Sequence, residues 1–292
     1  NAAGIHSLEI QHGIPKYYVH HRLVTTKLAA WGEFCKTHFV AESRLNPNDV
    51  VVTGSPTLDA LVRRDGRGDQ HLVRRSLGID AQDRIITFAV SPFHRGSRGG
   101  VIDEHLTREQ VEGALKEMLR AVDSFSGVHF VVKLHHTDPN LDRVREFICQ
   151  TGFKNPFTVV KAFDIYALMN SSEAVLSLGS TAILEAIALG TPVIAMDVSG
   201  ALDVKPFAER GSLVPAEGAE DVRNALELIL GDKKVFLRAA QEGRAKALRD
   251  FAAGADSQSG KRCVALLSEL LSRESVGYFS KRYVTSQTPF IP

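Results

Sequence analysis

Short apolar runs rich in β-branched residues alternate with longer amphipathic stretches along most of the chain. Such runs are typical of parallel strands buried on both faces, and the amphipathic stretches are typical of covering helices. The alternation therefore predicts an α/β fold, a doubly wound parallel sheet with helices on both sides. The predicted strands cover residues 50–53, 85–90, 128–134, 157–160, 174–177 and 193–196. The predicted helices cover residues 107–122, 139–149, 180–189, 219–230, 233–250 and 259–273.

The beginning and the end of the chain depart from this alternation. Two short candidate strands, SLEIQ and KLAAWG, are separated near the N-terminus by a loop rich in His, Tyr and Pro. Since the chain starts without Met and enters a strand almost at once, we expect it to be part of a longer protein. The predicted organisation is residues 1–48 as the end of another domain, 49–275 as the main domain, and 276–292 as a tail without helical periodicity.

The composition narrows the classes of partner. The chain has 292 residues and a formal net charge of +1, which argues against broad electrostatic binding of nucleic acid or an anionic membrane. An anion therefore has to be bound locally. The three Cys residues form no zinc pattern and indicate reduced thiols. No apolar run approaches the roughly 18 residues of a membrane span, and no signal peptide opens the chain, so we expect a cytoplasmic protein; peripheral membrane association stays open.

The most informative segment is SEAVLSLGSTAILEAIALGTPVIAMD, at residues 172–197. It predicts a buried strand, a sharp turn at Gly179, and a helix that opens at Ser180 and Thr181. A helix that starts directly after a parallel strand presents free N–H groups and a partial positive charge, which suit a phosphate. The two hydroxyls can add donors, and Glu185 lies one turn further, within reach of a sugar hydroxyl. From spacing alone, the alternative that Ser180 only caps the helix and Glu185 faces water weighs equally.

This segment resembles the donor-binding signature of the GT-B glycosyltransferases and their relatives. These include the UDP-N-acetylglucosamine 2-epimerases, the CDP-glycerol glycerophosphotransferases and bacterial capsule transferases. The resemblance implies that the turn of Gly179, Ser180 and Thr181 holds the donor diphosphate and that Glu185 holds the ribose. The epimerases carry Ser-Gly-Gly in this turn and a further Glu after the ribose residue. Because this chain has Gly-Ser-Thr and Ala186, the resemblance to a plain epimerase is weaker.

Further segments resemble the same superfamily in the expected order. QHGIP at 11–15 is similar to its His-Gly-x-Pro element, and VVTGSPTLDAL at 51–61 is similar to its entry to the donor domain. KLHHTD at 133–138 is similar to its His-Pro element, with His136 in place of the proline, and ADSQSGKRCVALLSEL is similar to its closing helix. The resemblance implies a GT-B-like donor-binding domain at 49–275. Residues 1–48 then end an acceptor-side, Rossmann-like domain.

Five further positions are candidate site residues. His12 and His135 both follow predicted strands, and the resemblance places them where one can accept a proton from an acceptor hydroxyl and the other can assist the departing nucleotide. Taken singly, histidines at strand ends are more often structural. Gly54 and Ser55 form a turn that can touch phosphate, although capping of the next helix is the favoured alternative for Ser55. Arg95 can neutralise a diphosphate or be an ordinary solvated loop arginine.

Several motifs are absent from the sequence, and their absence limits the chemistry. There is no GxxxxGK[ST] loop, no strand-linked GxGxxG, no GxSxG and no HExxH. No Asp-x-Asp pair occurs, so we expect no metal ion on the diphosphate and no cofactor besides the nucleotide-sugar substrate. The charge of the leaving group then has to be met by a helix dipole, hydroxyls, His and Arg, which agrees with the metal independence of the GT-B group.

These observations predict a metal-independent glycosyltransferase. It would move a sugar from a nucleotide-activated donor to a surface polysaccharide or another glycan acceptor. Two alternatives stay open: a sugar-nucleotide epimerase or hydrolase on the same scaffold, and a noncatalytic module that binds nucleotide sugars.

Overall fold

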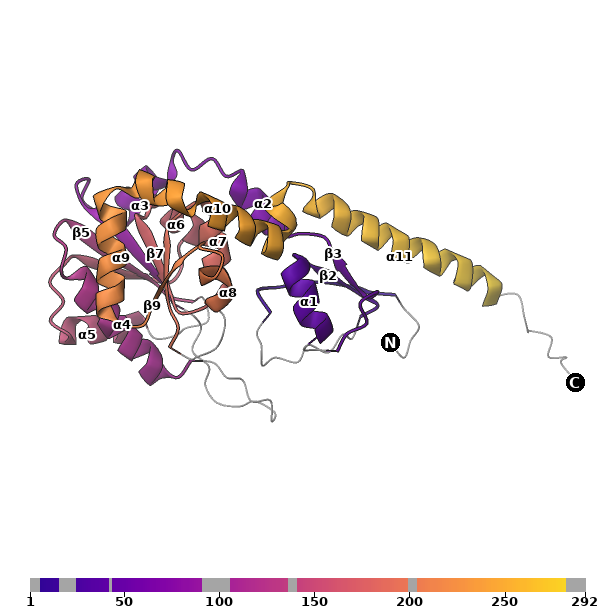
Figure 1. Cartoon of the computed structure of the whole chain (residues 1–292), viewed down its shortest axis with the longest axis horizontal. Helices are drawn as coiled ribbons and strands as arrows, with labels where there is room; N and C mark the ends of the chain where they lie inside the picture. The colour runs from indigo at the N-terminus through magenta and orange to yellow at the C-terminus, as the bar shows by residue number, and fades with distance from the viewer. Residues whose placement is uncertain are drawn as a thin grey trace, which may run out of the picture.

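The computed structural model describes residues 6–15, 25–41, 44–90, 106–135, 141–198 and 204–281, with side chains up to residue 272. Its main body is a parallel sheet in the strand order β6-β5-β4-β7-β8-β9 (Figure 1). The strands are β4 (Arg84–Ala89), β5 (Val128–Lys133), β6 (Phe157–Val160), β7 (Ala174–Ser177), β8 (Val193–Met196) and β9 (Val214–Ala216). The predicted α/β class with a parallel, helix-covered sheet is confirmed.

The strand order creates one point where the direction of winding reverses. The chain runs outward from β4 through β5 to β6, then returns to place β7 on the other side of β4. Open parallel sheets bind ligands outside the carboxyl ends of the strands at such a switch point, because the following connections diverge there and leave a crevice. The carboxyl ends of β4 and β7 are therefore the first place to look for a site.

Helices cover both faces of this sheet. One apolar core joins the inner residues of β4 and β5 to α4 (Arg108–Val122), α5 (Leu141–Gln150) and α9 (Ala219–Gly231). A second core, on the opposite face, joins α7 (Thr181–Leu189) and α10 (Lys233–Ala252) to the sheet. On that face also lie α3 (Asp69–Leu77) and α6 (Ile165–Ser171), which pack on a smaller cluster around Val131. Both faces are thus buried, as the continuous apolar strands require.

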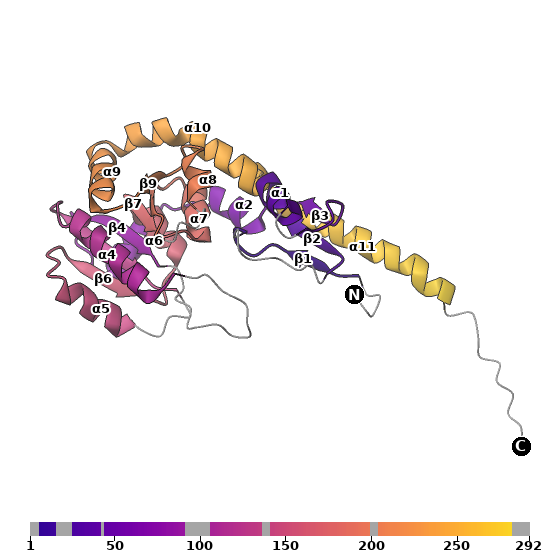
Figure 2. The same ribbon diagram turned by 60° about the horizontal axis from the view of Figure 1, so that its bottom comes forward.

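A smaller parallel sheet stands beside the main body. It contains β1 (Leu8–Ile10), β2 (Lys27–Ala30) and β3 (Val50–Val52) in that order, with α1 (Glu33–Ala41) and α2 (Pro56–Val62) following β2 and β3. The last helix, α11 (Ser259–Lys281), packs Cys263 and Leu266 onto this sheet and then projects away from the body (Figures 1 and 2). A short helix, α8 (Lys205–Ala208), precedes β9.

The sequence predictions match most elements and differ from the structure at several others. Both candidate N-terminal strands are present, and Thr107 and Gln110 form the predicted capping box. The predicted boundary after residue 48 separates β2 from β3, although the two pair in one sheet, so the first sheet extends past that boundary. The prediction that the chain leaves helical structure at residue 276 is wrong, because α11 continues to Lys281. The sequence analysis also missed β9 and the helices α1, α3, α6 and α8.

No helix in the described part of the chain has the length and apolar character to cross a bilayer.

Candidate functional site

The helix start predicted at residue 180 lies at the switch point of the main sheet. β7 ends at Ser177, and Gly179 turns the chain with a φ of 93°, a left-handed value that a side chain disfavours. Ser180 is the N-cap of α7, since its backbone is extended and its Oγ accepts a hydrogen bond from Ala182 N at 3.2 Å. The predicted turn and cap are both present.

Three amide groups at this helix start have no partner in the described part of the chain. Within the described residues, the N–H groups of Gly179, Ser180 and Thr181 donate no hydrogen bond to the protein. Unpaired N–H groups at a helix start carry the positive end of the helix dipole, so this end of α7 is suited to an anion. The capping alternative for Ser180 and the phosphate prediction are therefore compatible, because the cap occupies only the Ala182 amide.

A turn from the small sheet lies directly against this helix start. The N–H of Ile14 donates to Thr181 Oγ1 at 3.4 Å, and a Cβ added to Gly13 would lie 3.1 Å from the same oxygen. Buried Gln11 holds the turn from inside, donating to Gly13 O at 2.7 Å and accepting from Trp31 N at 2.7 Å. The start of α7 thus faces the seam between the two sheets.

Glu185 lies one turn into α7 and is partly buried. Tyr166 of α6 donates its hydroxyl to Glu185 Oε1 at 3.1 Å, while Oε2 accepts no hydrogen bond within the described residues. Burial raises the pKa of Glu185, and the Tyr166 hydrogen bond and the nearby His12 charge oppose this rise. Burial, with the adjacent Glu185 carboxylate, raises the pKa of Tyr166 to about 12, so Tyr166 remains a donor. Glu185 therefore does not simply face water, and one oxygen remains for a ligand hydroxyl.

The two candidate histidines approach this site from different sides. His12 is exposed, follows β1 in the turn against Thr181, and is close enough to Glu185 to affect its ionisation. His135 lies two residues beyond the end of β5, and Gly179 lies two residues beyond the end of β7, with β4 between them in register. Because neighbouring strands are about 4.8 Å apart, the two strand ends are separated by about 10 Å. Both histidines thus belong to the same edge of the molecule.

Gly54 and Ser55 are packed inside the protein. Ser55 is 1% exposed, and its Oγ accepts from Leu58 N at 3.3 Å as the N-cap of α2, which confirms the capping alternative. A Cβ on Gly54 would lie 2.1 Å from Ser259 Oγ, so this glycine is needed for the approach of α11. Donor contact by these two residues stays a prediction, and it would require the Ser55 hydroxyl to become exposed. Arg95 lies outside the described residues.

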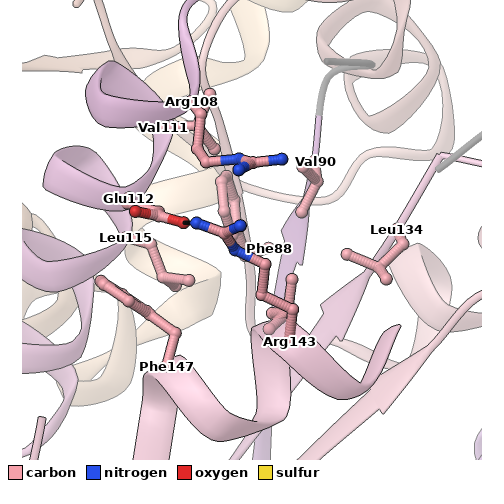
Figure 3. A pocket seen from close by; sticks show the side chains of 10 residues that line it. Phe88, Val90, Arg108, Val111, Glu112, Leu115, Leu134, Arg143 and Phe147 are labelled. Carbon is pink, nitrogen blue, oxygen red and sulfur yellow. Dashed lines mark hydrogen bonds and ion pairs between the residues drawn. The ribbon is translucent and has the colours of Figure 1, made fainter. Parts of the chain in front are cut away.

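A pocket on the opposite face of the main sheet is distinct from this site. It lies between α4, α5 and the ends of β4 and β5, and Arg143 closes one side by pairing with Glu112 at 3.1 Å (Figure 3). Its floor is apolar, with Phe88 and Leu134 pointing into it, away from the α7 face. No group of three or more possible metal ligands is found among the described residues. The metal independence of the reaction stays a prediction.

Two residues near the site were not predicted from the sequence. Gln11 lies inside the QHGIP segment, so the motif contained it without indicating its role. Tyr166 is 19 positions from Glu185, and no local spacing links the two.

Comparisons with known proteins confirm the resemblance seen in the sequence. The model of the UDP-N-acetylglucosamine 2-epimerase family matches residues 2–259. The D-inositol 3-phosphate glycosyltransferase of Corynebacterium aurimucosum is 28% identical over 195 residues, which cover 64% of this chain and 44% of that protein. This chain therefore spans less than half of that curated relative.

Two solved structures share the fold. The co-structure of S. aureus MnaA with UDP has a TM-score of 0.59 at 17% identity and covers 86% of this chain and 61% of that chain. The wall teichoic acid polymerase TagF has a TM-score of 0.58 at 13% identity and covers 91% of this chain and 68% of that chain. At these identities the likeness shows the fold alone.

Proposed function

Because the chain belongs to the UDP-N-acetylglucosamine 2-epimerase family, we propose that it binds a nucleotide sugar at the start of α7 and transfers the sugar to a carbohydrate acceptor without a metal ion. The observation that carries the proposal is that the amides of Gly179, Ser180 and Thr181, at the switch point of the sheet, donate to no group in the described part of the chain. The acceptor is a surface polysaccharide or another glycan.

Two parts of the donor nucleotide, the diphosphate and the ribose, are bound by α7. Its diphosphate accepts hydrogen bonds from the free amides and from the Ser180 hydroxyl, and the dipole of α7 offsets its charge. Glu185 Oε2, which has no partner within the described residues, accepts a ribose hydroxyl. The UDP in the MnaA co-structure supports this choice of ligand class, because that protein shares the fold.

Transfer needs a base for the acceptor and stabilisation of the leaving group. His12 is exposed in the turn that faces α7, and it takes the proton from the acceptor hydroxyl. The acceptor oxygen bonds to the anomeric carbon as the bond from that carbon to the phosphate oxygen breaks. The electron pair leaves with the nucleoside diphosphate, whose charge is met by α7 and by a proton or hydrogen bond from His135.

Epimerisation at carbon 2 of the sugar is the second candidate, and the matched family model favours it. That reaction removes a proton from the carbon beside the anomeric centre, so it needs an acid and a base next to the sugar. Glu185 supplies a carboxylate on α7, and one of its oxygens is already bonded to Tyr166. Because Glu185 is already engaged by Tyr166, the arrangement favours sugar transfer over epimerisation.

One set of assays separates the candidates. The full chain is titrated calorimetrically with UDP, CDP, GDP and CMP, and the matching nucleotide sugar is then incubated with and without glycan acceptors. Consumption of the donor only with an acceptor supports transfer, and isomerisation of the donor alone supports epimerisation. Binding without either reaction leaves the noncatalytic module. If a folded sample binds none of the nucleotides at about millimolar concentration, the donor site is withdrawn.

A further inference from the structure

Lys133 is a buried cation at the edge of the sheet where the donor site lies. It is the last residue of β5 and is only 8% exposed. Its Nζ donates to Leu134 O at 2.9 Å, and within the described residues it forms no ion pair with a carboxylate. Burial lowers the pKa of the Lys133 ammonium, and no carboxylate among the described residues offsets this effect. The charge is thus desolvated, and the described part of the chain supplies no matching anion.

The register of the sheet directs Lys133 to the face that carries α7. Lys133 pairs with Ala89 of β4, and Ala89 pairs with Ser177 of β7, so the three side chains share one row and one face. At the far end of this row, Ser177 Oγ is 3.5 Å from Ser180 Oγ, the cap of α7. The middle residue, Ala89, is small. The Lys133 ammonium and the start of α7 therefore lie on either side of the switch point.

Other cations with restricted exposure have evident structural partners. Arg244 of α10 donates to Ile187 O and Ala188 O at 2.8 Å each, and Arg210 pairs with Asp250 at 2.8 Å. Lys133 has one adjacent carbonyl instead. A buried charge is costly unless it is paired, and here the second positive feature of the same edge, the start of α7, increases the cost. An anion between the two would relieve both.

We propose that Lys133 binds the diphosphate of a nucleoside diphosphate ligand, opposite the amides at the start of α7. This inference rests on the proposed function and assigns the cation of that same site. Lys133 is a binding residue in this account: it neutralises phosphate oxygens in the bound donor and in the departing nucleoside diphosphate, and it transfers no proton.

The test compares the removal of a buried lysine with the removal of an exposed lysine. Lys133→Met keeps the length and apolar stem of the side chain. Lys154→Met removes an exposed lysine that precedes β6, at the amino ends of the strands, whereas Lys133 lies at the carboxyl end of β5. Both variants and the wild type are titrated with UDP, CDP and GDP and with the corresponding nucleosides. For the diphosphate that the wild type binds most tightly, Lys133→Met is expected to bind about 10- to 100-fold more weakly. Its nucleoside affinity and all affinities of Lys154→Met are expected to change less than about twofold.

Thermal melting separates ligand binding from a structural role. Because Lys133 is desolvated and has no acidic partner among the described residues, Lys133→Met is expected to melt at the same or a higher temperature than the wild type. Lys133→Gln, which retains a donor for Leu134 O, serves if the Met variant does not fold, and the same loss of diphosphate affinity is expected. An unchanged diphosphate affinity in the folded variant overturns the assignment of Lys133 alone. Absence of diphosphate binding by the wild type overturns the donor site and this inference together.

Discussion

The helix α7 is nine residues long, and its two ends differ in how their polar backbone groups are satisfied. At the carboxyl end, Gly190 adopts a left-handed φ of 80°, and Arg244 donates to the carbonyls of Ile187 and Ala188. At the amino end, Ser180 caps one amide and three others have no partner within the described residues. The first end is closed by the protein, whereas the second is left open to the seam between the sheets.

The difference between the two ends of α7 indicates where a ligand is expected in this fold. A helix leaves polar groups unpaired at both ends, and a protein normally satisfies them with caps or side chains. A guanidinium from a distant helix satisfies them at one end of α7, whereas the other end has three amides without a partner in the described part of the chain, so we expect a ligand at the open end. Substitutions at the closed end are then expected to change stability, and substitutions at the open end are expected to change binding or turnover.

The largest effect is expected for His12→Gln at the open end. Loss of a general base reduces turnover by about 100- to 10,000-fold, while the affinity for the nucleoside diphosphate changes less than about twofold. The measurement is product formation with donor and acceptor, alongside calorimetry of the same preparation. Unchanged turnover would remove His12 from the mechanism.

Arg244→Met tests the closed end. Two buried carbonyls of α7 lose charged donors, so the free energy of unfolding is expected to fall by about 2 to 4 kcal/mol. Arg249→Met is the matched control on the same helix, because Arg249 is mostly exposed and is expected to contribute less than about 1 kcal/mol. Denaturant unfolding gives both values. A loss of nucleotide affinity in folded Arg244→Met, without a loss of stability, would contradict the distinction between the two ends.

Glu185→Gln tests the ribose contact and carries a pH signature. Affinity for a ribonucleoside diphosphate is expected to fall about 10-fold or more, with a smaller change for the dideoxyribose analogue. Burial raises the pKa of Glu185 in the folded state. Protonated Glu185 therefore contributes to the stability of the folded wild type below the unfolded pKa, and this contribution is lost as pH rises through the folded pKa. The melting temperature of the Gln variant relative to the wild type is therefore expected to increase from about pH 4 to about pH 8.

If that melting difference does not depend on pH, Glu185 is not a desolvated carboxylate. An equal loss of affinity for both sugars would instead show that Glu185 does not contact the ribose.

The smallest effects come from two N-caps, Ser180→Ala and Ser55→Ala. Each loses a cap worth about 1 kcal/mol of stability. Only Ser180 lies at the open end, so only its variant is expected to lose nucleotide affinity, by about three- to tenfold. Equal affinity losses in the two variants would restore the predicted donor contact of Ser55 and weaken the assignment to α7.

Local pattern was enough to predict most of the fold. Strands such as β5 and β7 are continuous apolar runs, and the helix after Gly179 follows from a small-residue turn before an apolar stretch. β9 was missed because its three residues include Pro215, which disfavours a strand assignment. The end of α11 was missed because Tyr278 and Phe279 break its helical pattern.

The candidate site could be predicted only for residues that lie close together in the sequence. Ser180, Thr181 and Glu185 lie on one helix, so spacing alone places them together. The contact between Ile14 and Thr181 joins residues 167 positions apart, and it arises only when the two sheets meet. Lys133 shares a row with Ser177 through the register of β4, which no single segment encodes. These contacts are products of tertiary packing.

The most direct test of the central claim is a crystal structure of the chain with a bound nucleoside diphosphate. We expect diphosphate oxygens within about 3 Å of the amides of Ser180 and Thr181, a range that defines a hydrogen bond. A diphosphate bound elsewhere, with no phosphate oxygen near those amides, would contradict the account.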